Sequence, residues 1–136
     1  MFKIDKERNV LIIKKDSVVV RHLRFDGKIV AGMFTNFWGN VEAEEVYLGK
    51  GCVVSGDITC KKAVIGAYTR FNRIVAEDVV FIQNHCVGKS VKARGVRIAS
   101  GSVIGTVEAD DYIVVDGASK LGKLNARRIV AMEGKI

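Results

Sequence analysis

Apolar residues recur along this chain at an almost constant interval. From residue 25 onward, similar phrases open with an apolar residue at spacings that alternate between 16 and 17 residues: Phe25, Val41, Ile58, Ile74, Val91, Val107 and Leu124. A fixed period of this length is typical of repeat proteins, in which one repeat cannot bury its apolar face alone but stacked repeats can. The spacing therefore predicts a solenoid.

Within each phrase, further columns of mostly apolar or small residues follow at fixed offsets. Small residues usually stand two positions after the opening residue: Gly27, Ala43, Cys60, Ala76, Ala93, Ala109 and Ala126. Five positions after it stand Val30, Val46, Ala63, Val79, Val96, Tyr112 and Ile129, and seven after it Gly32, Leu48, Ile65, Phe81, Ile98, Val114 and Ala131. A last column contains Trp38, Val54, Phe71, Val87, Ile104 and Leu121. Alternation is the strand period, so these columns predict side chains that fill a narrow tube.

The repeat length predicts the cross-section of the tube. An interval of 16 or 17 residues leaves room for strands of roughly four residues joined by tight corners, three of each in a coil. We therefore predict an all-β fold, a right-handed parallel β-helix of about seven coils with a triangular cross-section, since parallel crossovers are almost always right-handed. The chain has no proline, and valine and isoleucine dominate its apolar residues, which suits strands throughout.

The first 23 residues do not fit the columns. The sequence predicts strands at residues 10–13 and 18–23 around a turn at residues 14–17. These strands either cap the first coil or form an incomplete coil of their own. We therefore expect residues 1–23 to form a partly flexible N-terminal cap and residues 24–136 to form the β-helix domain.

Charged residues at one corner change sign from coil to coil. Lys28 is followed in successive phrases by Glu44 and Glu45, Lys61 and Lys62, Glu77 and Asp78, Arg94, Asp110 and Asp111, and Arg127 and Arg128. Stacking would place each acidic set between basic ones. Each exposed pair contributes only about 0.2–1 kcal/mol, but like charges at the same positions would cost a similar amount. We expect a charge ladder along this corner.

Composition and charge limit the classes of binding partner and the cellular compartments that we expect for this protein. The formal net charge is +7, but few aromatic residues lie between the basic ones, so nucleic-acid binding is not expected. Three cysteines without paired spacing suggest free thiols and a reducing compartment. The first 13 residues have no signal-peptide core, so we expect a cytoplasmic protein, with the inner membrane surface as a candidate location. Met1, Phe2 and Lys3 are candidates for contact with an anionic membrane.

The sequence offers little for catalysis. His85 stands beside Cys86, but the other cysteine of that corner, Cys52, would lie two coils away, at roughly 10 Å. The corner is interpreted as a small or polar column: Asn36, Cys52, Thr69, His85, Ser102 and Ala118. We therefore expect no catalytic residue, no cofactor, no metal and no small-molecule substrate. A β-helix acyltransferase would instead need about 18 residues per coil and a catalytic histidine beneath a loop.

Two segments carry a family resemblance. The segment 54–66 reads Val-Ser-Gly-Asp-Ile-Thr-Cys-Lys-Lys-Ala-Val-Ile-Gly, and the segment 104–109 reads Ile-Gly-Thr-Val-Glu-Ala. Both resemble the repeat of bactofilins, a polymer-forming cytoskeletal family, and the resemblance extends over about residues 25–136. It implies a right-handed triangular β-helix that polymerises end to end without nucleotide, often near a membrane, as a scaffold. Residues 34–38 are more aromatic than the usual coil, and residues 82–86 lack the usual corner glycine.

The resemblance and the open end of the last coil together suggest self-assembly. Apolar residues of that coil are the candidate interface: Leu124, Ile129, Met132 and Ile136. The charge ladder is basic at both ends, so stacking the last coil on the first would bring like charges together. We expect two C-terminal coils to meet instead. The alternatives are an interaction domain that does not polymerise, like that of septum-site inhibitors, and the acyltransferase-like enzyme.

Overall fold

The structure, a computed structural model, describes residues 2–132, and within that range it contains strands and no helix. Accordingly, no described segment is a helix long and apolar enough to cross a membrane. The strands are β1 Phe2–Asp5, β2 Val10–Ile13, β3 Val18–Val19, β4 Leu23–Ala31, β5 Asn36–Phe37, β6 Val41–Leu48, β7 Val53–Val54, β8 Asp57–Cys60, β9 Lys62–Ile65, β10 Arg73–Ala76, β11 Val79–Ile82, β12 Val87–Ile98, β13 Val103–Asp116, β14 Lys120–Asn125 and β15 Arg128–Met132.

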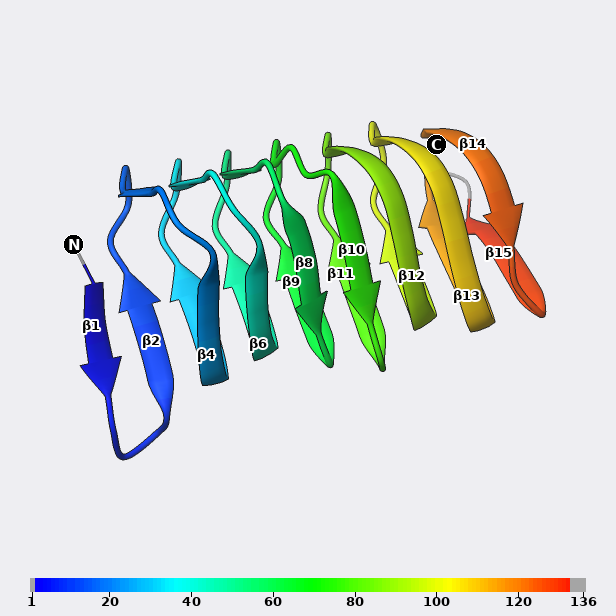
Figure 1. Cartoon of the computed structure of the whole chain (residues 1–136). Coiled ribbons are helices and arrows are strands. Elements are labelled where there is room, and N and C mark those ends of the chain that lie inside the picture. Colours follow the sequence, from blue (N-terminus) through cyan, green and yellow to red (C-terminus); the bar gives the residue numbers. More distant parts are fainter. Residues whose placement is uncertain (1, 133–136) are drawn as a thin grey trace.

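The strands stack as parallel coils along one axis (Figure 1). From β2 to β13, strands pair in parallel with the strand one coil further on, so that Ile58 lies beside Ile74 and Ile74 beside Val91. β7 continues into the next coil only through a single bridge to Arg70. The predicted all-β parallel solenoid of about seven coils is confirmed. The colours of Figure 1 run from end to end of the molecule in sequence order, because every coil contacts only its neighbours.

Three faces surround the core. Face 1 contains β8, β10, the start of β4 and β6, the middle of β12 and β13, and most of β14. Face 2 contains β2, β9, β11, β15 and the ends of the four long strands. Face 3 contains β3, β5 and β7, and it continues through single bridges at Arg70 into the starts of β12, β13 and β14.

The core consists of columns, as expected. The apolar residues that open each repeat, such as Ile58, Ile74 and Val107, are fully buried. The column of small side chains two residues later includes the buried residues Cys60, Ala76, Ala93 and Ala109. A narrow tube leaves room for only a small side chain at this position, because the chain turns there from face 1 to face 2. The same column in the second coil holds Ala43, which is half-buried against the core.

Two predicted columns are confirmed in some coils, where Val46, Ala63 and Val96 are buried, but were wrong by one residue in others. Val80 and Ile82 point inward where Val79 and Phe81 were expected, and Ile113 and Val115 replace Tyr112 and Val114. The reason is the corner between face 1 and face 2. It contains two residues between Cys60 and Ala63 but three between Ala76 and Val80, so a constant offset fails where the corner is longer.

The first coil carries the same kind of error. Leu23 pairs with Val41 and Phe25 with Ala43, and a bulge precedes Lys28. Phe25 therefore occupies the small column in place of Gly27, and Ile29 and Ala31 are the inward residues in place of Val30 and Gly32. A large ring fits at this position because no strand of the described chain covers face 1 on the N-terminal side of β4.

The column of face 3 also differs from the prediction. Phe37 is buried and Trp38 is 59% exposed, since β5 places Phe37 beside Val54. Gly88 replaces Val87, because the ring of Phe71 fills the space that a side chain at residue 88 would need; a Cβ atom there would lie 2.0 Å from Phe71 Cε1. One coil thus supplies the core side chain for the next.

The N-terminal segment is part of the solenoid. β2 pairs in parallel with the end of β4, and β3 pairs in parallel with β5, so residues 10–19 form an incomplete coil with faces 2 and 3 only. The predicted strand at residues 18–23 was wrong: β3 ends at Val19 and the chain turns a corner before β4 begins at Leu23. β1 runs antiparallel to β2 and covers its outer edge on face 2.

Replacing Ala93 with leucine should lower the free energy of unfolding by about 1–3 kcal/mol. Ala93 is buried beside Ala109 in a column of small side chains, so the added carbons must displace the corner. Lys92 lies next to it on the same strand with its side chain exposed, so Lys92→Leu is the matched control. Urea denaturation compares the two variants, and equal midpoints would contradict the column assignment.

Candidate functional site

A column of hydroxyl and thiol groups lines the corner between face 2 and face 3. Its members are Ser17, Thr35, Cys52, Thr69, Cys86 and Ser102, and all six are buried. Ser17 donates a hydrogen bond to Lys14 O within its own corner. The other five each donate to a carbonyl of an earlier corner; Cys52 Sγ lies 3.3 Å from Gly32 O and Thr69 Oγ1 lies 3.3 Å from Gly49 O. The column therefore satisfies backbone groups that the turn leaves without a strand partner.

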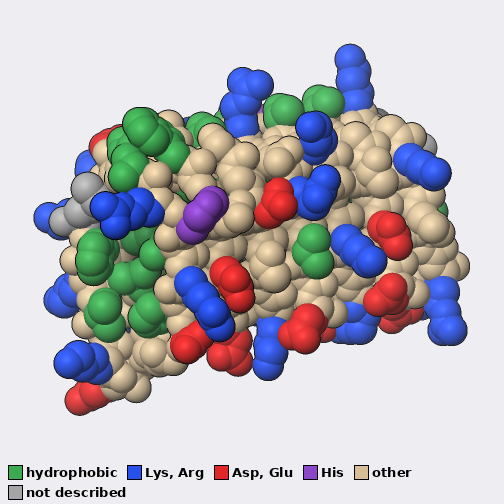
Figure 2. Space-filling model, in the orientation of Figure 1, with side chains coloured by type: hydrophobic (Ala, Val, Ile, Leu, Met, Phe, Trp, Pro, Cys, Tyr) green, Lys and Arg blue, Asp and Glu red, His purple; other side chains and the backbone are tan. Residues whose placement is uncertain are grey.

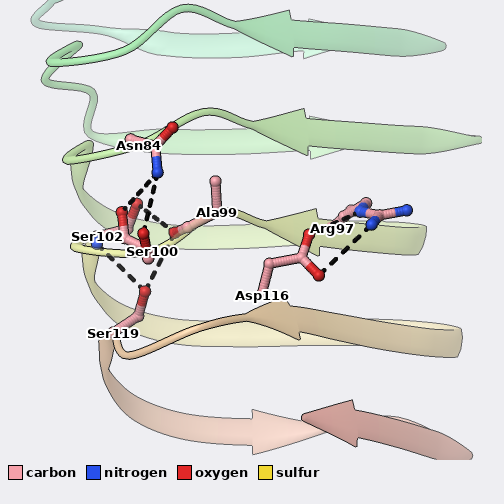
Figure 3. A network of polar contacts seen from close by, with 7 residues as sticks. All are labelled: Asn84, Arg97, Ala99, Ser100, Ser102, Asp116 and Ser119. Atoms are coloured by element: carbon pink, nitrogen blue, oxygen red, sulfur yellow. Dashed lines mark hydrogen bonds and ion pairs between the residues drawn. The ribbon is translucent and has the colours of Figure 1, made fainter. Parts of the chain in front are cut away.

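The C-terminal end of this column forms a small network (Figure 3). Ser102 Oγ donates to Gln83 O and Ala99 O, both at 3.2 Å, and Ser119 Oγ donates to Ala99 O at 3.1 Å. The predicted corner column is corrected at three places, where Thr35, Cys86 and Ser119 replace Asn36, His85 and Ala118. Phe34 precedes Thr35 and His85 precedes Cys86, and both Phe34 and His85 direct their side chains out of the tube.

The turn at this corner uses left-handed backbone. The residues with positive φ there are Asp16, Phe34, Gly51, Tyr68, His85, Gly101 and Gly117. Non-glycine residues adopt this conformation at a cost, and the aromatic ones stack: the rings of Tyr68 and His85 lie 5.0 Å apart, and Lys50 Nζ lies 5.4 Å from the centre of the Tyr68 ring. His85 is thus an exposed stacking residue on the outside of the corner.

The three thiols are separate and buried. Thr69 lies between Cys52 and Cys86, and Cys60 belongs to the small column of face 1. Burial raises the pKa of all three thiols, for Cys60 to about 12. Residues 2–132 contain no group of three or more histidine, cysteine or carboxylate side chains that could hold a metal ion. All three cysteines are therefore residues of the buried core.

The corner between face 1 and face 2 carries the alternating charges. Lys28 Nζ lies 4.0 Å from Glu45 Oε1, and Lys61 Nζ lies 3.7 Å from Glu44 Oε1. Arg94 bridges two coils, at 2.7 Å from Asp78 Oδ1 and 3.6 Å from Asp111 Oδ2. Arg128 continues the series to Asp111 at 3.6 Å. The Asp78 carboxylate raises the pKa of Arg94 through this hydrogen bond.

Not every residue of the predicted charge ladder is paired. Among the described residues no ion pair joins Lys61 or Lys62 to Glu77 or Asp78, and none includes Asp110 or Arg127. Lys62 instead lies near the Tyr47 ring. Four described ion pairs lie outside the predicted ladder: Arg8 with Asp5, Arg24 with Glu42, Arg73 with Asp57, and Arg97 with Asp116. The last pair, at 2.8 Å, is drawn in Figure 3, and its Asp116 stands at another corner, outside the repeated phrase.

At the C-terminal end, the outer edges of β14 and β15 have no strand partner in the part of the chain that the structure describes. Ile129 and Met132 are each 48% exposed there, whereas Leu124 is half-buried against the core. Ile136 lies outside the described residues. Arg127 and Arg128 lie at the same end, so this end of the described residues is an apolar surface with basic neighbours.

The N-terminal end is a hollow, which we call the N-terminal mouth. Its floor includes the buried residues Leu11 and Ile13, its apolar walls are Phe2, Ile4, Val18, Val19, Val20, Leu23 and Phe25, and its polar residues are Arg21, His22 and Arg24. Its volume is about 480 Å³. Figure 2 shows apolar side chains gathered at this end among basic ones. Phe2 and Lys3 are exposed residues of β1, and Met1 lies outside the described residues.

Comparison with protein-family models, with curated proteins and with solved structures finds no match to this chain. The function must therefore be argued from the two ends, the two polar corners and the exposed residues described above.

The raised pKa values predict an alkaline loss of stability. Folding favours the protonated thiols, so their contribution is present below the ordinary thiol pKa near 9 and is lost as pH rises from there toward about 12. The loss is at most about 1.4 kcal/mol per pH unit for each thiol. Cys60→Ala matches the alanines at the same position in the coils before and after it. In this variant the free energy of unfolding, measured with urea, should fall less steeply between about pH 9 and pH 11 than in wild type. An unchanged slope would contradict the assignment.

Contact of the N-terminus with an anionic membrane stays a prediction. The exposed Phe2 ring would insert, and Lys3 would add about 1 kcal/mol near the surface. Phe2→Ser should then reduce co-sedimentation with phosphatidylserine vesicles, whereas Trp38→Ser, which removes an equally exposed ring elsewhere, should not. Equal co-sedimentation of wild type and Phe2→Ser with these vesicles would contradict the predicted membrane contact.

Proposed function

We propose that this protein is a non-enzymatic, self-assembling scaffold of the cytoskeletal type, whose subunits associate end to end without nucleotide. The observation that carries the proposal is the exposed C-terminal coil. Within residues 2–132, β14 and β15 have no strand partner on their outer edges, which lie beside the exposed apolar side chains of Ile129 and Met132. An open strand edge with apolar side chains is a template for another chain.

Charge favours contact between like ends. The last coil carries Arg127 and Arg128, and the N-terminal mouth carries Arg21 and Arg24, so a head-to-tail stack would bring basic groups together. Two C-terminal coils related by a two-fold axis can instead turn their arginines away from each other while Ile129 and Met132 meet. Growth beyond the pair then requires a second contact at the N-terminal end. Such a scaffold would act in the cytoplasm, in keeping with the resemblance to bactofilins.

Ile129→Arg should leave a folded protein that sediments as a smaller species than wild type. The added guanidinium would lie in the apolar contact and beside Arg128, where both desolvation and like charge oppose association. Met132→Arg should act in the same way, and Val75→Arg is the matched control, since Val75 is a partly exposed apolar residue in the middle of face 1. Sedimentation velocity and negative-stain microscopy measure the outcome, and circular dichroism verifies folding.

Two results would contradict this proposal. One is a wild-type protein that stays monomeric at all concentrations, which would favour the regulatory interaction domain. The other is an Ile129→Arg variant that assembles as wild type does, or filaments in which all subunits point the same way, which would displace the interface from the C-terminal coil.

A further inference from the structure

We propose that the N-terminal mouth is a strand-binding site, which accepts an extended, acidic segment of a partner protein with apolar side chains at alternate positions. The first evidence is the incomplete coil. Residues 10–19 supply faces 2 and 3, but within residues 2–132 no strand lies on face 1 below β4. In Figure 1 the front row of strands begins with β4. β1 and β2 belong to the row behind it and reach further toward the N-terminal end. One strand of the first coil is missing.

The missing strand leaves backbone groups of β4 facing the mouth. Leu23 N–H donates to Asn40 O in the next coil at 2.8 Å. Because successive residues of a strand direct their N–H and C=O groups to opposite neighbours, Arg24 directs its own toward the side without a strand. An added strand would pair with these groups, as peptides do when they extend an exposed sheet edge.

The side chains of the mouth match a strand with apolar residues on one side. The floor of Leu11 and Ile13 is the end of the core column of face 2, and Phe25 closes the hollow at the corner of face 1. Ile4 on β1 forms part of the wall, because the antiparallel hairpin places it opposite Leu11. Residues at alternate positions of an inserted strand would cover this floor in the way that Leu23 and Phe25 cover the next coil.

The polar residues of the N-terminal mouth, which form its rim, favour a partner with negative charge. Arg21 and Arg24 line the mouth, and the Arg24 side chain is largely exposed, with Glu42 at 3.8 Å. His22 Nδ1 accepts a hydrogen bond from Asn40 N–H at 2.9 Å, so the neutral ring carries its proton on Nε2 and can donate it to a carbonyl or carboxylate. These groups suit a strand flanked by aspartate or glutamate.

Charge also argues against a second copy as the occupant. The described ends of another subunit present Arg21 and Arg24, or Arg127 and Arg128, to this basic rim. Its own β1, the one short strand at its N-terminal edge, is already paired with β2. An acidic partner segment therefore fits better than a copy of this chain.

The test uses the full chain carrying Ile129→Arg, so that association through the C-terminal coil does not interfere. The probe is a fluorescein-labelled peptide of about eight residues that alternates valine with glutamate. Fluorescence anisotropy should show saturable binding that weakens with salt. A peptide with lysine in place of glutamate, and one of the same composition with its valines contiguous, should each bind at least about tenfold more weakly.

Matched variants locate the binding. Ile4→Glu and Val20→Glu place a carboxylate in the mouth and should weaken binding about tenfold or more. Ile12→Glu is the control on the same hairpin, since Ile12 is 41% exposed against 48% for Ile4 but lies outside the mouth. Arg24→Glu should weaken binding, and Arg73→Glu, which alters a similarly exposed arginine paired with Asp57 on the same face, should not.

The proposal is overturned if the alternating peptide does not bind, or if Ile4→Glu and Ile12→Glu bind it equally. Displacement of the peptide by phosphatidylserine vesicles would identify the occupant as lipid, and a dimer of the Ile129→Arg chain that the peptide dissociates in sedimentation would identify it as a second copy. Either result would overturn the assignment to a partner strand. The proposed assembly is judged separately, by the sedimentation of wild type against Ile129→Arg.

Discussion

Parallel hydrogen bonding between consecutive coils is the interaction on which the other features depend. It places each residue about 4.8 Å from its counterpart in the next coil, so that every position of the repeat becomes a column. The buried apolar columns, the corner donors and the alternating charges are all consequences of this one spacing. Arg94, for example, reaches both Asp78 and Asp111 because the coils before and after it hold carboxylates at the same corner.

The same interaction explains why the ends differ from the middle. An interior coil is hydrogen-bonded and covered on both sides, whereas a terminal coil has one open side. β1 covers part of the N-terminal edge by running antiparallel to β2, and it leaves face 1 of the incomplete coil empty among the described residues. The surfaces to which we assign assembly and strand binding are therefore the two places where the repeat stops.

The sequence predicted the class of fold and the core because the repeat is visible as a period. Ile58, Ile74, Val91 and Val107 were assigned correctly, since the openers lie on straight strands of face 1. Positions beyond the first corner were assigned correctly in three coils, where Val46, Ala63 and Val96 are buried. They were wrong by one residue where that corner holds a different number of residues, as before Val80 and Ile113. A constant offset cannot detect this variation, and only the alternation inside β11 and β13 would have indicated it.

The candidate surfaces were harder to predict. The charge ladder and Ile129 could be identified because they belong to the repeated phrase. The mouth could not, because it results from where β1 and β2 lie in space rather than from any motif. The corner donors were missed by one residue at three positions. His85, whose backbone is left-handed, points outward where it was expected to point inward, and Asn36 and Ala118 each stand one residue from the donor.

The contact of Phe71 with Gly88 has a consequence for how such a chain can be rearranged. Coils of a solenoid are often treated as interchangeable modules, but here the ring from one coil occupies the space reserved by the glycine in the next. Duplicating the coil with Phe71 would place two rings in one layer, and deleting it would leave the layer above Gly88 without a side chain. Any recombination that preserves the core must therefore move these two coils together.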